Sequence, residues 1–596
     1  MPSDYWNNYW RGRTSRRRFL GAGAAAGAGA AGIALVGCGD DDDAPANGAP
    51  ADDDSAPANG DDTAAGDDER YGGILRFPYV GVSSGDPPTL FPFENLTYLA
   101  QVQASMHYSR LVTEYAGPDV EPEDYTALEG DLAESMPEQP DDQTYIFKLR
   151  ENIHFHDKEP MNGRQATAED FVDTYRAFLS MSQNAATYED IIENVEATDE
   201  FTVQFTLSQP FAPFLAIHAS TTEGLWFIPV ESIDGGQAQE SPVGTGPWVF
   251  DSWESGVSLN WNRNPNYFIP ELPYFDRAEA SLINDPQRIL AGLRAGDLDM
   301  SGLTAPLYDE AQEQLDQDGY EHFSGHTNVT SFWFNFDNDG GRWQDRRLRQ
   351  ALSMSLNRES ILDTLDPTGQ GDYQSPFCAP VLAPFFLSPR NDDYGDSAQF
   401  FEFNPQEARQ LFEAATGEET PFIRINANVD AYGRLREQKW ELTAASLQEA
   451  GWDVELNYQE YGTYIQTTFL GEIDEGVALG PLIGAPRDPH DILSRNISSR
   501  SARRNWGGEP PEEMDRIEEM IDEQVTMLDL DERLEYIHEM QRELAEYMVT
   551  VPHVGPSGFT YVNPWMQNYH HKSGFAFPFT SLSRAYFTPE RIAEDA

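Results

Sequence analysis

Apolar and polar residues alternate along this chain in two regular ways. Residues 144–150 and 201–207 place an apolar side chain at about every second position, which is typical of strands with one buried face. After Thr167, which has capping-box spacing to Asp170, residues 171–179 instead form one apolar helical stripe. Strands and amphipathic helices follow one another in this chain, so we expect an α/β protein.

The clearest sign of parallel strands lies in the second half of the chain. Residues 423–429 and 454–458 are β-prone, and residues 431–450 between them have helical spacing that ends at Gly451. A strand, a helix and a strand in this order favour parallel pairing, so the sequence predicts a partly parallel sheet here.

A turn-rich segment, residues 241–267, predicts a sharp turn followed by a β-hairpin. Two short β-prone runs flank Gly256, and the turn before them is rich in glycine and proline. We expect the chain to return at this point to a lobe that began near residue 70.

Further elements are expected from the same patterns. They are strands at 72–80, 330–336 and 550–562, a continuation of the 144–150 strand through 151–157, a helix over 99–111, a helix over 285–294 stopped by Gly296, a helix marked by Leu348, Ala351, Leu352 and Leu356, a helix capped by Asn404-Pro405, and one helical stretch over 511–548.

Charge changes the picture, because 101 acidic residues stand against 39 basic ones, only four of them lysine. The first 70 residues account for 13 of the acids and six of the bases, so residues 71–596 still hold 88 acids and 33 bases. Molar salt shortens the Debye length to about 3 Å and screens such a surface. We therefore expect a halophile's protein that loses structure when desalted. Nucleic acid is excluded as a partner, because phosphate binding needs clustered lysine and arginine.

The first 70 residues have the composition of an export signal followed by a tether. Arg16 and Arg17 precede a weakly apolar Ala/Gly stretch, a pattern that resembles a twin-arginine export signal, and residues 35–38 resemble a lipobox ending at Cys38. We expect residues 1–38 to be this signal, with Cys38 lipidated, and the acidic residues 39–70 to be a disordered tether. A membrane-spanning helix is the alternative for the first stretch, which is short and weakly apolar for that role.

Four stretches, in this order, resemble the family 5 extracellular solute-binding proteins of ABC importers, which include oligopeptide, dipeptide and nickel binders. The stretches are YIFKLRENIHFHD with ATAED at 145–157 and 166–170, PVGTGPW with RNPNY at 242–248 and 263–267, DRRLRQALSMSLNRE at 345–359, and RLEYIHEMQ at 533–541. The resemblance covers roughly residues 71–590. Taken with the lipobox and the excess of acidic residues, it leads us to expect a lipoprotein of a halophilic archaeon.

The resemblance implies a two-lobed periplasmic-binding-protein-like fold (type II, Venus flytrap) with an extra subdomain inserted in the first lobe. On this pattern lobe I is formed by 71–110, 243–325 and 560–590, the inserted subdomain by 111–242, and lobe II by 331–550. The chain would cross between the lobes near 326–330 and 551–559, and closure around a ligand would be a population shift.

The implied function is capture of a peptide-like solute at the extracellular face of the membrane and its delivery to an ABC permease and ATPase complex, by a monomer without a cofactor. In the peptide binders of the family an acidic residue shortly before an Asp-Pro pair meets the ligand's ammonium group. Here that position holds Ala485, before Asp488-Pro489. Asp488 could take the role itself, or it could be a helix N-cap or turn carboxylate.

Aromatic residues complete the predicted ligand site. Trp506, Trp333, Tyr461 and Tyr464 are candidates for its walls, because solute pockets are mostly apolar with a few polar anchors. Each could instead be a core residue.

Other functions have weaker support in the sequence. An oligosaccharide or a chelated metal fits the same fold as a ligand. His154 and His156 lack a third metal ligand nearby, and no hydrolase, zinc or phosphate-loop motif is present, so we expect neither a resident metal nor an enzyme. A secreted hydrolase with spatially assembled carboxylates and a surface-layer protein stay open as alternatives.

Overall fold

The computed structural model describes residues 69–82, 86–95, 98–122, 124–182, 184–189, 191–221, 224–323, 329–429, 434–481, 487–501, 503–572 and 579–595. The predicted export signal with Arg16 and Arg17, the predicted lipidation site Cys38, nearly all of the predicted tether, and Ala485 lie outside the described residues.

The predicted hairpin forms within a four-stranded sheet. Its strands are β7 (Trp248–Glu254) and β8 (Ser258–Arg263), which pair antiparallel around Gly256, whose φ is +73°. The sheet has the order β1-β9-β8-β7, in which β1 (Ile74–Val82) runs parallel to β9 (Arg277–Ser281). The hairpin therefore does return to the strand that begins near residue 70.

The turn before the hairpin requires glycine for steric reasons. A Cβ on Gly244 would lie 2.1 Å from the carbonyl oxygen of His107, and one on Gly246 would lie 2.7 Å from the carbonyl carbon of the same residue. The backbone of this turn is thus pressed against the segment at His107, while Trp248 and Trp261 behind it are fully buried. These close approaches show that the turn serves packing.

A second, three-stranded sheet has the order β10-β19-β11 and contains a strand from the far end of the chain. Strand β19 (Gly558–Val562) pairs antiparallel with both β10 (Met300–Thr304) and β11 (Tyr320–Phe323). Helix α10 (Pro286–Ala295) precedes β10 and ends at Gly296, as predicted.

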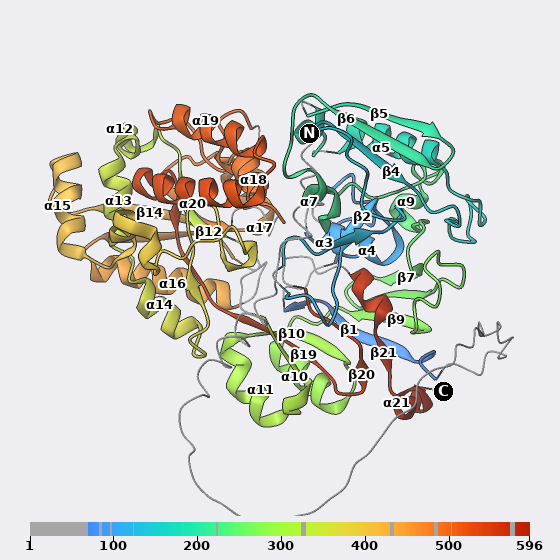
Figure 1. The fold of residues 1–596 in the computed structure, drawn as a ribbon. Helices are drawn as coiled ribbons and strands as arrows, with labels where there is room; N and C mark the ends of the chain where they lie inside the picture. Colours follow the sequence, from blue (N-terminus) through green and yellow to red (C-terminus); the bar gives the residue numbers. More distant parts are fainter. Residues whose placement is uncertain are drawn as a thin grey trace, which may run out of the picture. The chain divides into compact units, whose positions relative to one another are not determined.

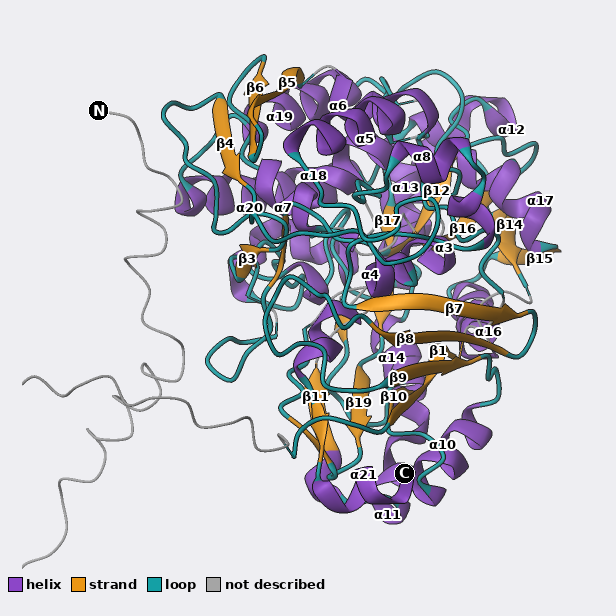
Figure 2. Cartoon of the chain, turned by 90° about the vertical axis from the view of Figure 1, so that its right-hand side faces the viewer, coloured by secondary structure: helices purple, strands orange, loops and turns teal. Residues whose placement is uncertain are grey.

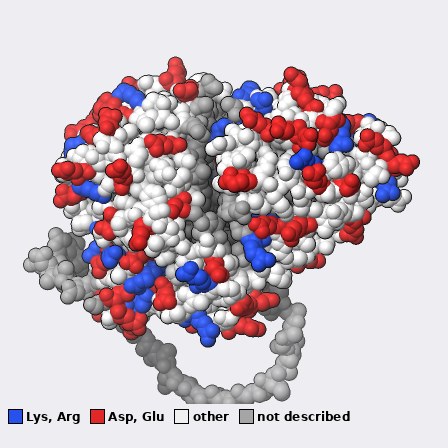
Figure 3. Space-filling view, turned by 180° about the vertical axis from the view of Figure 1, so that it is seen from behind, with Lys and Arg blue, Asp and Glu red and all other residues white. Residues whose placement is uncertain are grey.

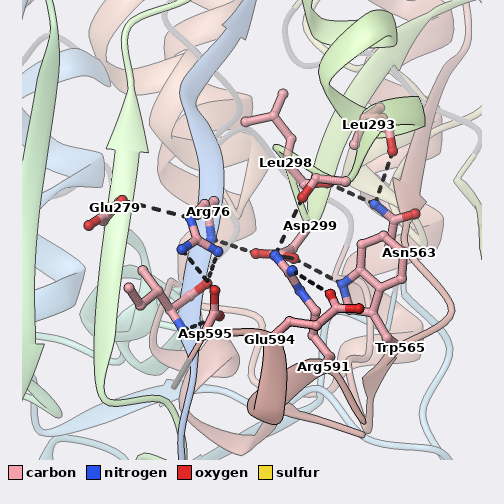
Figure 4. Close-up of polar contacts among 12 residues, drawn as sticks. Arg76, Glu279, Leu293, Leu298, Asp299, Asn563, Trp565, Arg591, Glu594 and Asp595 are labelled. Atoms are coloured by element: carbon pink, nitrogen blue, oxygen red, sulfur yellow. Dashed lines mark hydrogen bonds and ion pairs between the residues drawn. The ribbon is translucent and has the colours of Figure 1, made fainter.

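A polar network joins the two ends of the described chain (Figure 4). The Asp299 carboxylate accepts the backbone N–H of Arg76 at 2.7 Å and the Trp565 indole N–H at 2.9 Å. Arg76 in turn forms an ion pair of 2.9 Å with Asp595, in helix α21 (Pro589–Asp595). The C-terminal helix is thereby held against the first strand.

The third sheet and its helix lie within residues 111–242. Strands β4 (Thr144–Lys148), β6 (Thr202–Leu207) and β5 (Ile192–Asp199) pair antiparallel in that order, and α5 (Ala168–Met181) packs against them. Thr167 and Asp170 form the predicted reciprocal capping box at the start of α5.

Two predictions in the first half were wrong. The segment 151–157 is not a continuation of β4: it turns, and only His154 forms an isolated bridge, with Gln165. The helix expected over 99–111 is instead two short helices, α3 (Tyr98–Val102) and α4 (Ala104–His107), and the chain is extended from Tyr108. Apolar spacing misled here because this segment is buried on all sides, so its pattern carries little information on helix length.

The fourth sheet lies within residues 330–555 and has the order β15-β14-β16-β12-β17, in which the edge strand β17 spans Val551–Pro552. Strand β14 (Phe422–Asn428) runs parallel to both β15 (Asp453–Gln459) and β16 (Val477–Pro481), which confirms the predicted parallel pairing. Strand β12 (Thr330–Phe334) joins antiparallel, so the sheet is mixed. Helix α16 (Arg434–Glu449) connects β14 to β15 and packs against β15.

The last helical stretch is two helices and not one. Helix α19 (Met514–Val525) ends near Thr526, and α20 (Leu530–Tyr547) begins at an Asp529 N-cap whose side chain accepts the backbone N–H of Glu532. An Asp N-cap inside an apparently continuous apolar pattern is the signal that was overlooked.

The remaining elements frame these sheets. They are β2 (Val112–Glu114), β3 (Leu128–Gly130), α6 (Ala185–Glu189), α7 (Phe214–Ala219), α8 (Val230–Asp234), α9 (Gln237–Glu240), η2 (Ala305–Leu307), α11 (Tyr308–Gln314), η3 (Gln317–Gly319), α12 (Asn338–Gly341), η4 (Arg342–Gln344), α13 (Arg346–Met354), α14 (Arg358–Leu365), β13 (Asp372–Tyr373), η5 (Pro380–Leu382), η6 (Asp392–Phe401), α15 (Pro405–Thr416), α17 (Tyr461–Gln466), η7 (Thr468–Leu470), α18 (Pro489–Ile492), η8 (Leu493–Ile497), β17 (Val551–Pro552), β18 (Val554–Gly555), β20 (Met566–Gln567), η9 (Phe579–Arg584) and β21 (Tyr586–Phe587).

The chain passes between the second and fourth sheets twice. It leaves β11 and enters β12, and it later leaves β17 and β18 and enters β19. In Figure 1 the elements of residues 330–555 gather around the fourth sheet, apart from the other three sheets, and Figure 2 shows the strands of the first sheet stacked side by side from a second direction. Two crossings of this kind suit a molecule whose halves move relative to each other.

Acidic side chains are spread over the face seen in Figure 3, with basic ones among them, and no large basic patch interrupts them there. Within the described part of the chain, no helix has both the length and the apolar character needed to cross a membrane.

Candidate functional site

Asp488, the residue that the sequence put forward as an ammonium ligand, lies in a fully buried ion pair. Its two carboxylate oxygens each accept a hydrogen bond of 2.7 Å from the Arg533 guanidinium, and both side chains are 0% exposed. The Asp488 carboxylate also accepts the backbone N–H of His490 at 2.9 Å, which makes it the N-cap of α18. The N-cap alternative is therefore confirmed, while the ammonium role stays a prediction.

A third partner of Asp488 comes from a distant part of the chain. The hydroxyl of Tyr125 donates a hydrogen bond of 2.7 Å to Asp488 Oδ2. Tyr125 lies between β2 and β3 of the 111–242 region, whereas Asp488 and Arg533 belong to the 330–555 region. The Asp488 carboxylate thus joins two parts of the fold.

Electrostatics keep this carboxylate charged. Burial alone would raise the pKa of Asp488, but the Arg533 guanidinium and the hydrogen bonds from Arg533, Tyr125 and His490 outweigh it and lower the pKa below its usual value. The neighbouring His490 imidazole has a pKa lowered to about 4, chiefly by burial, so this ring is neutral near pH 7. We use the name Asp488 junction for Asp488 with its partners Arg533 and Tyr125, the Phe385 ring that packs against Tyr125, and the ion pair between Arg487 and Glu114.

Two of the predicted wall aromatics lie together at Gly480, near the end of β16 in the fourth sheet. Trp333 on β12 is fully buried and donates its indole N–H to the carbonyl of Thr468 at 3.3 Å. The hydroxyl of Tyr464 on α17 donates to the carbonyl of Leu479 at 3.2 Å. Both rings approach Gly480, where a Cβ would lie 2.2 Å from the Tyr464 hydroxyl oxygen and 3.1 Å from the Trp333 ring. They support the end of β16.

The other two predicted aromatics lie at different depths. Tyr461 begins α17 and is half-buried. Trp506 is 3% exposed; its indole N–H donates to the carbonyl of Ile497 at 2.7 Å, and its ring packs against Phe336 with centroids 5.5 Å apart. Trp506 therefore packs in the 330–555 region beside the chain that follows α18, whereas Tyr461 retains some access to solvent.

The described residues were compared with the requirements of a metal site and of a reactive cysteine. No group of three or more His, Cys, Asp or Glu residues among them is arranged to hold a metal ion. His156 is buried while His154 is exposed, so the two do not share a face. Cys378 is a free, buried thiol whose pKa is raised by burial, as expected of a small core residue.

Comparison with known proteins identifies the family. The family model described as bacterial extracellular solute-binding proteins, family 5, middle region, matches residues 127–501. The chain belongs to this family. It is a solute-binding protein of the ABC-importer type, and its family is non-enzymatic.

Similar proteins include two curated solute-binding proteins. Di/tripeptide-binding protein 2 of Pseudomonas aeruginosa (strain UCBPP-PA14) is 25% identical over 457 residues, which cover 72% of this chain and 81% of that protein. Heme-binding protein A of Haemophilus influenzae (strain ATCC 51907 / DSM 11121 / KW20 / Rd) is 25% identical over 519 residues, covering 81% and 87%.

A solved structure confirms the fold of this solute-binding protein. The periplasmic binding protein DppA of Helicobacter pylori, in complex with the peptide STSA, superimposes with a TM-score of 0.70 at 20% identity and covers 87% of this chain and 99% of its own. The mixed α/β periplasmic-binding-protein fold expected from the sequence is thereby confirmed.

Several residues of the Asp488 junction were not singled out as site residues. Arg533 belongs to one of the family-like motifs, but the sequence assigned it no role. No sequence pattern pointed to Arg487, Glu114 or Phe385. Tyr125 lies in an acidic turn whose sequence is typical of exposed loops, so only the folded chain reveals that this ring is 2% exposed.

Proposed function

We propose that this solute-binding protein captures a peptide-like solute between two lobes at the extracellular face of the membrane and delivers it to an ABC permease and ATPase complex. The observation that carries the proposal is the double crossing between the second and fourth sheets, in a chain similar to a di/tripeptide-binding protein and to a structure that holds the peptide STSA.

The proposed lobes follow the sheets. Lobe I comprises 71–110, 243–325 and 560–590, the inserted subdomain 111–242, and lobe II 331–550. The sheets support this division, because each of the four lies within one of these parts apart from single residues and short strands at the crossings.

The proposed ligand walls are Trp333, Tyr461, Tyr464 and Trp506, with Asp488 at the edge. Their depths favour different roles. Tyr461, half-buried at the start of α17, suits direct contact with ligand, whereas Trp333 and Tyr464 suit support of the chain that follows β16. Asp488 suits a positioning role, since its oxygens already accept hydrogen bonds from Arg533, Tyr125 and His490.

A chelated metal is the second candidate ligand, and one observation favours it: the similarity to a heme-binding protein over 81% of this chain. An oligosaccharide fits the same fold without such support. Peptide remains the first choice because both the di/tripeptide-binding relative and the peptide-bound structure share it.

The test is a thermal-shift screen in molar KCl. Pools of short peptides, hemin, nickel chelates and short oligosaccharides are offered separately, and mass spectrometry identifies any small molecule that co-purifies. A ligand present at a hundred times its Kd stabilises the folded state by about 2.7 kcal/mol, which raises Tm measurably. A shift with peptide pools alone supports the proposal, and a shift with hemin or a nickel chelate alone favours the second candidate.

We further propose that the protein is exported by the twin-arginine route and anchored by a lipid on Cys38, with residues 39–70 as the tether. Composition supports this, as does membership of an extracellular family. The Cys38→Ser chain is expected in the culture medium and the native chain in the membrane fraction. Equal membrane recovery of both chains would contradict the lipid anchor.

Salt dependence tests the proposed halophilic origin. With 88 acids and 33 bases after residue 70, surface repulsion is expected to unfold the protein when salt is removed. Circular dichroism melts in molar and in millimolar KCl measure this. An equal Tm in the two solutions would contradict the proposal.

A further inference from the structure

Tyr125, 2% exposed, is buried where the 111–242 region meets the 330–555 region. Its ring packs edge-on against Phe385 with centroids 4.8 Å apart, and the Arg533 guanidinium lies over the other ring, Phe385, at 5.2 Å. The hydroxyl donates to Asp488 at 2.7 Å. One aromatic side chain from the first region thus occupies a socket built entirely by the second.

Two cations from other parts of the chain hold the backbone around Tyr125. Arg487 donates to the carbonyl oxygens of Tyr125 and Asp124, and it also forms an ion pair with Glu114 in which the two side chains are 7% and 10% exposed. The Lys572 ammonium donates to the Asp124 carbonyl as well, at 2.6 Å. Segments of all three proposed parts of the chain therefore meet at the peptide group that precedes Tyr125.

The socket does not depend on Tyr125 for its own construction. Arg533 and Asp488 pair bidentately within the 330–555 region, and Gln524 Oε1 accepts a further hydrogen bond of 2.7 Å from Arg533. The loop that carries Tyr125 is likewise ordered locally, because the Asp124 carboxylate accepts the N–H of Thr126 at 2.8 Å. Both surfaces can thus persist when the regions separate.

Other described contacts also join these two regions. The N–H of Ala212 donates to the carbonyl of Val525 at 2.7 Å, Arg503 donates to the side chain of Asn184 at 2.9 Å, and the Phe211 ring packs edge-on against His490 with centroids 5.3 Å apart. The Asp488 junction differs from them because it combines a buried tyrosine with a buried arginine, and these residue types often carry most of the energy of an interface.

We propose that Tyr125, clasped by Arg487, is a latch that stabilises the closed arrangement of the two lobes and so sets the affinity for ligand. This inference rests on the proposed function. Apparent affinity falls with the population of the binding-competent state, so a residue that stabilises closure changes Kd even if it never touches the ligand. Tyr125 is accordingly a positioning residue.

Two variants separate the contributions of the latch. Tyr125→Phe removes only the hydrogen bond to Asp488, and Tyr125→Ala also empties the socket. We expect the Kd for the stabilising peptide pool to rise about twofold to tenfold in the first and more than tenfold in the second. Tyr458→Ala, at a 41% exposed tyrosine of β15, is the matched control and should leave Kd unchanged.

A distance measurement reads closure without relying on ligand. Spin labels at Met181→Cys and Leu470→Cys, which replace exposed side chains of the two regions, report their separation in the Cys38→Ser chain, where Cys378 is buried and unreactive. We expect Tyr125→Ala to lengthen the mean distance in molar KCl, with and without peptide, and Tyr125→Phe to lengthen it less.

The two proposals fail in different ways. If the native chain binds no peptide, the proposed function fails, and the label distances still decide the latch. Identical distance distributions in the native chain and both variants overturn the latch. A Kd within twofold of native in Tyr125→Ala overturns it as well, and a lowered Tm alone, without a change in Kd or distance, assigns Tyr125 a structural role instead.

Discussion

Buried charge is handled in opposite ways at the Asp488 junction and at the crossing segment, residues 551–555. At the junction Arg533 faces a carboxylate, bidentately. At the crossing segment Arg358 and Lys439 are also buried, but they donate to backbone carbonyls: Arg358 to Pro552 at 2.8 Å and Lys439 to Val554 at 2.6 Å. Among the described residues no carboxylate forms an ion pair with either cation.

The pKa values of Arg358 and Asp488 reflect these different partners. Burial lowers the pKa of Arg358 to about 10, because it removes water from around the guanidinium. At the junction the carboxylate has its pKa lowered despite burial, because Arg533 is adjacent.

The comparison teaches that the two regions constrain the chain differently. The crossing segment is held to α14 and α16 by hydrogen bonds from Arg358 and Lys439 to its backbone carbonyls. These carbonyls are neutral, so the attachment does not use an ion pair. At the junction the charged pair is complete within one region and presents its remaining acceptor capacity to Tyr125. A clamp suits a segment that stays with lobe II, and a preformed socket suits a contact that opens and closes.

The largest expected effect is at the junction. Arg533→Met leaves the Asp488 carboxylate buried without its cation, so we expect the free energy of unfolding to fall by about 3–5 kcal/mol. Urea titration in molar KCl measures it. Arg176→Met, at a side chain 61% exposed, is the control and should change little. If Arg533→Met lowers the free energy of unfolding no more than Arg176→Met does, the Asp488 carboxylate is not shielded from solvent as the structure indicates.

The next effect depends on pH. His490 is neutral in the folded chain with a pKa of about 4, below its value of about 6.5 in the unfolded chain, so its contribution is complete above pH 6.5 and is lost as pH falls toward 4. We expect His490→Gln to reduce the loss of stability between pH 7 and 4 by on the order of 2–3 kcal/mol. The exposed His154→Gln serves as the control. Parallel pH profiles of native and His490→Gln chains would refute this.

At the crossing segment the expected cost is smaller. Arg358→Met leaves neutral carbonyls without a donor, which destabilises the folded state. It also removes a buried cation, and the free-energy cost of desolvating that cation is removed with it. We expect a loss of about 1–3 kcal/mol, from the unsatisfied acceptors. The same urea titration checks it, and a cost equal to or above that of Arg533→Met would reverse the comparison between the two regions.

The smallest expected effect is that of salt on these differences. Salt screens exposed charges strongly and buried pairs weakly. The destabilisation caused by Arg533→Met is therefore expected to change by less than about 1 kcal/mol between half-molar and several-molar KCl, although the stability of the native chain itself rises. A large drop in the Arg533→Met effect at high salt would show that solvent ions reach the junction.

Local sequence predicted much of the fold. Gly256, Gly296 and the Thr167 capping box each act within a few residues, so the pattern predicted the hairpin, the end of α10 and the start of α5 correctly. Errors arose where local pattern was ambiguous, as in the break between α19 and α20.

The candidate site was predicted less well, for a physical reason. Whether Asp488 is exposed depends on Arg533 and Tyr125, which are 45 and 363 residues away. Likewise the wall aromatics were chosen by residue type, but Trp333 and Trp506 are buried in the 330–555 region whereas Tyr461 is half-exposed. Residue type does not encode depth.

By itself the sequence determined the alternation of strands and helices, the excess of acidic residues and the resemblance to solute-binding proteins, because these follow from spacing, composition and motifs along the chain. The export address is a prediction from the same kind of evidence. Only the tertiary structure decided that Asp488 is a paired, N-capping carboxylate and that Tyr125 fills a socket beside it. Burial and charge pairing depend on which distant segments meet in space, and that information is absent from any single stretch of the chain.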